Sequence, residues 1–169
     1  MGAPLQINLP LLLHIPPSPG HIIPVVIFMN DVEMLNSIMQ NAEMGCQGVT
    51  AVRKRVDNQA VDKMLCDHLT RYGKIYHAAG HMLRAKGEAP KHIHPVAKTM
   101  TRFSAQRDLR RDSTPSHVAE MMIKGSTMGV NKLVRCMREY DYSNPDVTLL
   151  AKKLLDAEEA HIHELRGLL

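Results

Sequence analysis

Glu158 and His161 are two ionisable residues three positions apart near the end of the chain, in the run Glu158-Glu159-Ala160-His161. In an α-helix, residues at this spacing lie on the same face about one turn apart, so the carboxylate and the imidazole can reach the same ligand. Glu-x-x-His is also the spacing that metal-binding helical bundles use. The pair therefore indicates a site that holds a metal ion or a proton, or in which the two side chains pair with each other.

The residues around this pair form an apolar seam of the kind that faces the interior of a helix bundle. Seam positions recur at alternating spacings of four and three, which is typical of a helix packed on its neighbours. They are Val147, Ala151, Leu154, Glu158, His161, Leu165 and Leu168. A charge removed from water without a partner costs several kcal/mol or neutralises itself. An inward-facing acid and imidazole therefore predict a partner in the interior.

Glu120 is the third polar residue that we expect on a core seam, on the preceding helix. That seam is predicted at Glu120, Ile123, Thr127, Val130, Val134 and Met137. With a turn near Tyr142, Glu120 lies roughly 22 residues before it and His161 roughly 19 after it, which places the two within about one turn, ~5 Å, along the axis. A Glu from one helix and a Glu-x-x-His from its partner make half of a carboxylate-bridged dimetal site.

At this point the chain resembles the ferritin-like superfamily of four-helix bundles. Residues 116–130, SHVAEMMIKGSTMGV, are similar to a group of uncharacterised short bacterial ferritin-like proteins, and the resemblance covers about residues 30–169. It implies a dinuclear site with a second Glu-x-x-His on the second long helix. That helix contains no Glu, and offers His68, Tyr72 and Tyr76 instead, while the first helix offers Glu43.

Three interpretations of these residues remain open. The first is a buried hydrogen-bonded cluster without metal, formed by Tyr72, Glu120, Glu158 and His161. The second is a single metal ion on Glu120, Glu158 and His161, with Glu43 or Tyr72 nearby. The third is a working dimetal oxidase or iron store. Glu and His ligands suit iron, manganese or zinc, and the sequence identifies neither catalytic residues nor an organic cofactor.

The elements that would position this site are all helical. Periodicity and capping residues predict helices at about 31–55, 59–85, 95–107 and 114–139, and a last one from Pro145. Short turns join the first two and the last two long helices, whereas residues 86–114 form a long crossover that carries the short helix Pro95–Arg107. Two hairpins joined in this way are the connectivity of a ferritin-like four-helix bundle. The hairpins also look weakly alike, because Ala42-Glu43-Met44-Gly45 is similar in pattern to Ser126-Thr127-Met128-Gly129.

The first two long helices have seams of their own. The first is predicted to bury Leu35, Ile38, Ala42, Gly45, Val49, Val52 and Val56. The second is predicted to bury Val61, Leu65, His68, Tyr72, Ile75, Ala79 and Met82. In the third, the small residues Gly125, Ser126, Thr127 and Gly129 favour close packing against a neighbouring helix or a second subunit.

Residues 1–28 read as a different kind of chain. Six prolines interrupt their Leu and Ile runs and no side chain is charged, so they fit neither a secretory signal nor a membrane span. Asn30 can cap the first helix, and Glu33 can reach back to complete a capping box. We therefore expect a Pro-rich apolar leader, disordered or a mis-assigned start with Met29 as the true one, followed by a single domain over residues 29–169.

Composition limits the function classes. The chain is 44% hydrophobic and 22% charged with a formal net charge of +4, which is ordinary for one globular domain and makes nucleic acid an improbable partner. Three separate cysteines without Cys-x-x-Cys predict a reducing, cytoplasmic location and argue against a disulfide framework. We expect a self-associating structural or interaction bundle, a dimer, that is non-catalytic or weakly metal-binding. The alternative is an iron or manganese protein with oxidase or metal-handling activity.

Overall fold

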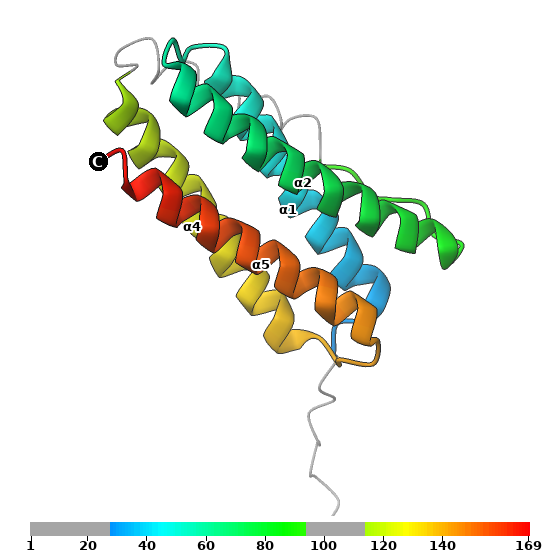
Figure 1. Cartoon of the computed structure of the whole chain (residues 1–169). Coiled ribbons are helices and arrows are strands. Elements are labelled where there is room, and N and C mark those ends of the chain that lie inside the picture. The colour runs from blue at the N-terminus through cyan, green and yellow to red at the C-terminus, as the bar shows by residue number, and fades with distance from the viewer. Residues whose placement is uncertain (1–27, 94–113) are drawn as a thin grey trace, which may run out of the picture.

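A computed structural model describes residues 28–93 and 114–169 and folds them into four α-helices. These are α1 (Asp31–Arg53), α2 (Gln59–Ala85), α4 (Pro115–Glu139) and α5 (Pro145–Arg166). They lie side by side as two hairpins, α1 with α2 and α4 with α5 (Figure 1). The predicted all-α class and the limits of the long helices are confirmed, although α1 ends at Arg53 and not at Arg55. Apart from Phe28, which is exposed, the leader expected at residues 1–28 lies outside the described residues, and so does the short helix expected at Pro95–Arg107.

Each helix begins at a side chain that accepts hydrogen bonds from the free N–H groups of the first turn. Asn30 and Glu33 form the predicted capping box at α1, and Asn58, Thr114 and Asn144 cap α2, α4 and α5. Proline occupies the first turn of both α4 and α5, where its missing N–H has no intrahelical acceptor to lose. The local sequence thus fixes where each helix starts.

Contacts at one end of the bundle join the start of α1 to the ends of α2 and α4, and they show in which direction each helix runs. The amide N–H of Met29, just before α1, donates to the carbonyl of Glu139 at the end of α4 (2.7 Å). Lys86, just after α2, forms an ion pair with Asp31 in the first turn of α1 (2.6 Å). α1 is therefore antiparallel to α2 and α4 and parallel to α5. It follows that α2 ends and α4 begins at opposite ends of the bundle.

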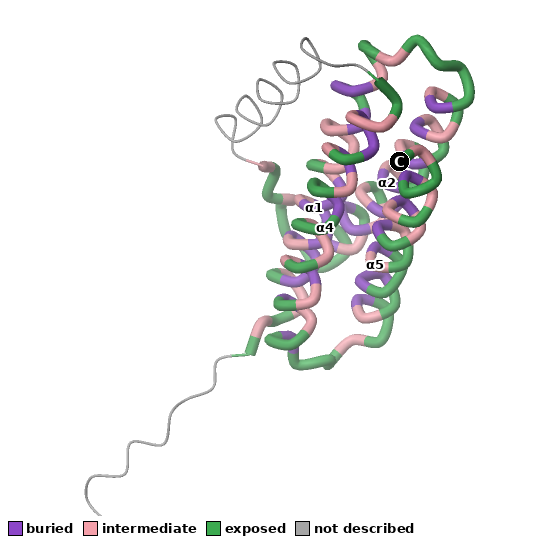
Figure 2. Tube along the Cα trace, turned by 90° about the vertical axis from the view of Figure 1, so that its left-hand side faces the viewer, coloured by how far each residue is buried: buried purple, intermediate pink, exposed green. Residues whose placement is uncertain are grey.

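The core is a continuous layer between the four helices, drawn in purple on their inner faces in Figure 2. On α2 and α5, every predicted seam residue is buried except Met82 and Leu168, which are half-buried. On α1 the same holds except for Gly45 and Val56, which are half-buried. Three of the four predicted seams are therefore confirmed.

The prediction for α4 was wrong by one residue. Its buried residues are Val118, Ala119, Met122, Ser126, Leu133 and Cys136. All of these except Val118 lie one position before a predicted seam residue. Glu120 and Thr127, which were expected to face inward, are exposed. One residue corresponds to a rotation of about 100° around the helix axis. The rotation brings Ser126 to the core and lets the carbonyl of Gly129 accept a hydrogen bond from Asn41 Nδ2 of α1 (3.0 Å).

Candidate functional site

A cluster of hydrogen-bonded polar side chains lies at the middle of the core, where α2, α4 and α5 meet. The hydroxyl of Tyr72 donates to Oε2 of Glu158 (2.7 Å) and lies 2.9 Å from Nδ1 of His161. Oγ of Ser126 lies 3.1 Å from the same nitrogen. We call these residues, Tyr72, Ser126, Glu158 and His161, the central cluster. Glu158 is 2% exposed and His161 1%, so their partners must come from the protein interior.

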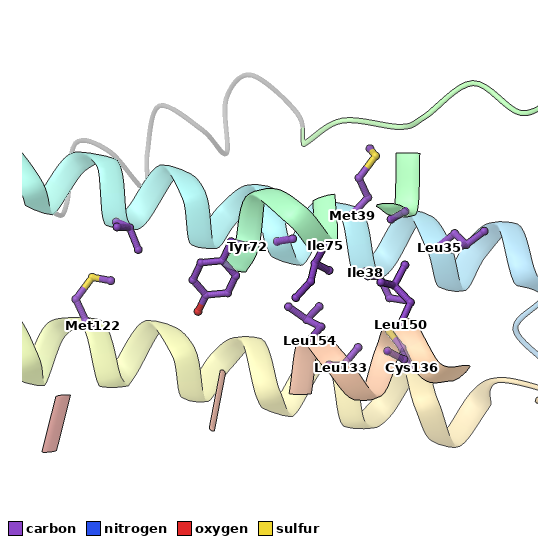
Figure 3. Close-up of a cluster of buried hydrophobic side chains, with 14 of the residues drawn as sticks. Leu35, Ile38, Met39, Tyr72, Ile75, Met122, Leu133, Cys136, Leu150 and Leu154 are labelled. Atoms are coloured by element: carbon purple, nitrogen blue, oxygen red, sulfur yellow. The ribbon is translucent and has the colours of Figure 1, made fainter. Parts of the chain in front are cut away.

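Two glycines make room for the central cluster. A Cβ on Gly129 would lie 2.9 Å from Oε1 of Glu158 and 2.9 Å from Oδ1 of Asn41. A Cβ on Gly45 would lie 2.9 Å from three ring carbons of Tyr72. Figure 3 shows the Tyr72 ring in the space between the α1 and α4 ribbons, with its hydroxyl directed away from α1. The helices can therefore approach the two polar side chains only because these positions lack a side chain.

His68 extends this polar region toward the surface. Its ring packs edge-on against that of His161, with the ring centroids 3.7 Å apart. Nε2 of His68 lies 2.6 Å from Oε2 of Glu164, and the other carboxylate oxygen of Glu164 accepts from Arg71 (3.0 Å). His68 is 1% exposed, whereas the side chain of Glu164 is 35% exposed. The chain His161–His68–Glu164 thus runs from the core to solvent.

Burial controls the protonation of this region. Burial raises the pKa of Glu158, and the hydrogen bond from Tyr72 opposes this rise without cancelling it. Burial, with a smaller contribution from the neighbouring His68, lowers the pKa of His161 to about 3. Burial also lowers the pKa of His68, against the opposing effect of Glu164. Both imidazoles are therefore neutral at pH 7.

One ring nitrogen of each buried histidine has no hydrogen-bond partner within residues 28–93 and 114–169. These atoms are Nδ1 of His68 and Nε2 of His161, and we call them the open nitrogens. A buried polar atom without a partner costs free energy, so native proteins satisfy nearly all of them. The two open nitrogens belong to rings in direct contact. Two buried ring nitrogens without a described hydrogen-bond partner therefore lie at the same point of the core.

The sequence predicted some of these residues and misplaced others. Tyr72, Glu158 and His161 come together as the first interpretation expected. Glu120 does not join them, because it is exposed and lies six residues, about 9 Å along α4, before Ser126, the residue that contacts His161. Glu43 is held elsewhere, since its Oε2 accepts from the amide of Ile93 (3.1 Å).

The five predicted metal ligands, Glu43, Tyr72, Glu120, Glu158 and His161, therefore do not form one ligand set. Among the described parts of the chain, no three His, Cys, Asp or Glu side chains gather as a metal-binding group. The residues present do not fit a dinuclear carboxylate site. Whether a metal binds any of them stays a prediction.

Sequence analysis missed the parts played by Ser126, His68 and Glu164. Ser126 was hidden by the one-residue error on α4. His68 was placed correctly on its seam, but its pairing with Glu164 needs the packing of α2 on α5. The signal that was available is the spacing of Glu164, three residues after His161 and therefore on a neighbouring part of the same helix face.

Comparison of the chain with family models, with curated proteins and with solved structures found no match. In the two described ranges, none of the helices combines the length and the apolar character that crossing a membrane requires.

Proposed function

We propose that this chain is a ferritin-like helical bundle with a structural or interaction role, non-catalytic or at most weakly metal-binding. The observation that carries the proposal is the position of the Tyr72 hydroxyl, which joins Glu158 and His161 inside the core. A protein hydroxyl thus occupies the position between acid and imidazole where a ligand shared by the two would lie. The pair is used to hold three helices together.

A buried network of this kind favours one arrangement of the helices over others. Inside a protein, each misplaced donor or acceptor is costly, so a satisfied network specifies the rotation and register of the elements that carry it. Here Tyr72 comes from α2, Ser126 from α4, and Glu158 and His161 from α5. The role proposed for the cluster is to set how the two hairpins fit together.

The ferritin-like assignment is supported by helix order and direction. The hairpins are joined between opposite ends of the bundle, and ferritin-like bundles have one such long connection. The alternative function, a mono- or dinuclear iron or manganese protein with oxidase or metal-handling activity, requires the Glu-x-x-His pair to turn from Tyr72 toward metal.

Iron oxidation separates these two functions. Iron(II) is added without oxygen to the full chain and to the double variant Glu158→Gln/His161→Gln, air is admitted, and the growth of iron(III) absorbance is followed. We expect equal rates, because the pair is structural. A wild-type rate well above that of the variant would overturn the proposal in favour of the oxidase. His77→Gln, at an exposed position of α2, is the matched control.

Self-association is the interaction that we propose for the bundle. Met44 of α1 and Met128 of α4 are 40% and 64% exposed, and both lie within about one turn of the contact between Asn41 and Gly129. Exposed methionines on neighbouring helices favour contact with another apolar surface. Sedimentation equilibrium should show a dimer that Met44→Gln/Met128→Gln converts to monomer, and a monomeric wild type would contradict this part of the proposal.

A further inference from the structure

We infer that the chain forms its dimer through the outward face of α4, which packs antiparallel on the same face of α4 in a second copy. This inference deepens the proposed self-association and rests on it. It specifies the surface, the register and the polar pairs of the contact. It also gives a role to Glu120, which the central cluster does not use.

The outward face of α4 carries a row of exposed side chains that has the same spacing when read from either end. Its first three members are separated by four and then three residues, and its last three, read backwards, by the same steps. Such steps keep residues on one face of a helix. The row consists of Glu120, Lys124, Thr127, Met128, Asn131 and Arg135. A row of this kind can face a copy of itself that runs in the opposite direction.

A two-fold axis between Thr127 and Met128 brings the two rows into register. A dimer with two-fold symmetry uses the same patch on both copies, so each pair of facing residues occurs twice. Met128 is 64% exposed and lies next to the axis in both copies, where it supplies the apolar centre of the contact. Lys124 of one copy then faces the neutral Asn131 of the other.

Opposite charges meet at both ends of this contact, because Glu120 of each copy faces Arg135 of the other. Within residues 28–93 and 114–169, neither side chain takes part in an ion pair of its own chain. The two residues are 15 positions apart, about 22 Å along α4, so they cannot reach each other in one chain. Both charges are therefore available to a partner.

The same charges disfavour the neighbouring registers. A shift of four residues in one direction would place Glu120 opposite Glu139 of the other copy. The same shift would place Lys124 opposite Arg135, so like charges would meet at every charged position of the row. A shift of four residues in the other direction would leave Glu120 opposite Asn131, without a cation. Charge complementarity thus selects one register of α4 on α4.

Charge reversal followed by sedimentation equilibrium tests this contact. The full chain is compared with Glu120→Arg and Arg135→Glu, each of which puts like charges opposite each other at both ends of the dimer. We expect each single variant to raise the dissociation constant of the dimer at least about 10-fold. If circular dichroism shows that either variant has lost its helices, Glu120→Gln decides in its place, with a rise of about 3-fold expected.

Recombining the two reversals is the decisive measurement. In an equimolar mixture of Glu120→Arg and Arg135→Glu, opposite charges again face each other at both ends of the mixed dimer. The double variant Glu120→Arg/Arg135→Glu restores the same pairs between identical chains. Both should associate within about 3-fold of the wild type. Because the two positions are too far apart to interact in one chain, this recovery can come only from pairing between chains.

Glu159→Arg is the matched control, because it makes the same reversal at an exposed position of α5. It should associate like the wild type, and weakening there would assign the contact to α5 and overturn the inference. Unchanged association in both single variants, or no recovery in the mixture and the double variant, would also overturn it and leave the proposed self-association in place. A monomeric wild type would contradict both.

Discussion

The two hairpins place a glycine opposite a large polar side chain at their centres, but the polar groups differ. In the first hairpin, the ring of Tyr72 on α2 lies against Gly45 on α1, and in the second, the carboxylate of Glu158 on α5 lies against Gly129 on α4. At both glycines an added Cβ would come within 2.9 Å of the opposing group. Each hairpin therefore packs a glycine against a polar group, which is a phenol in the first hairpin and a carboxylate in the second.

Counting from the N-caps shows that the glycines occupy corresponding positions. Thr114, the N-cap of α4, follows Asn30, the N-cap of α1, by 84 residues, and Gly129 follows Gly45 by the same 84 residues. Each glycine therefore lies at the same distance from the start of its helix. This agrees with the weak likeness of the two hairpins in sequence.

The polar residues correspond in the same way. Asn144, the N-cap of α5, follows Asn58, the N-cap of α2, by 86 residues, and Glu158 follows Tyr72 by 86 residues. These two equivalent residues are also the two that form a hydrogen bond with each other. The bond therefore joins matching points of the two hairpins.

The chemical difference between the hairpins makes them complementary. Two copies of the first hairpin would bring two phenols together, and two copies of the second would bring together two buried carboxylates, which cannot both ionise at short distance. One of each gives a donor facing an acceptor. The comparison teaches that a single pair of unlike residues can direct one hairpin to pack on the other.

Tyr72→Phe tests this pairing and should have the largest effect. The change keeps the ring against Gly45 but removes the proton donor of Glu158, so we expect the free energy of unfolding to fall by about 2–3 kcal/mol in urea denaturation. Tyr76→Phe is the control, because its hydroxyl bonds to the exposed side chain of His92, and it should change stability by less than about 0.5 kcal/mol. Equal effects of the two changes would refute the special role of Tyr72.

Alanine at either central glycine tests whether the packing is shared. Gly45→Ala and Gly129→Ala should each lower stability by about 1–2 kcal/mol, because overpacking outweighs the gain in helix propensity. Gly48→Ala and Gly125→Ala are controls on the same helices, since a Cβ there meets no described atom within 4 Å. These controls should raise stability by about 0.5–1 kcal/mol. If Gly129→Ala raised stability, the two glycines would not have equivalent packing roles.

Asp31 marks where the equivalence ends, because the position 84 residues later is Pro115. Its carboxylate binds Lys86 of the first hairpin and accepts from Tyr140, Ser143 and Asn144 of the second. Burial by itself would raise the pKa of Asp31, but these partners together lower it from 3.8 to about 2.

The lowered pKa of Asp31 gives a pH-dependent contribution to stability. The contribution is present above pH 4 and is lost as the pH falls toward 2, because the unfolded state then binds the proton first. We expect a loss of about 1–2 kcal/mol over this range, allowing for solvent screening. Asp31→Asn should remove this part of the pH dependence in parallel denaturation series. If wild type and variant lose stability identically between pH 4 and 2, the junction is not electrostatic.

The two asparagine caps provide the finest test. Asn58 and Asn144 each accept hydrogen bonds from two N–H groups of their helices, so alanine at either position should cost about 1 kcal/mol. Asn144→Ala should cost slightly more, because Asn144 Nδ2 also donates to Asp31. Thermal denaturation monitored by circular dichroism measures both, and a larger loss at Asn58 would reverse the expected order.

Local signals were sufficient for the helices and for part of the site. Caps and prolines mark the start of each helix because they act on the nearest N–H groups, and the seams of α2 and α5 place Tyr72, Glu158 and His161 inside because each helix has one clearly apolar face. The contact of His68 with Glu164 was not predictable in this way, since it depends on how far α2 and α5 slide past each other.

The sequence by itself determined the helices, their limits and three of their buried faces. Only the tertiary structure decided the face of α4, because two faces one residue apart both carry apolar side chains there and propensity does not distinguish them. The face with Ser126 and Gly129 is buried because the carboxylate of Glu158 and the ring of His161 need a hydroxyl and an empty Cβ position opposite them. Those requirements belong to α5 and act on α4 only once the helices are packed.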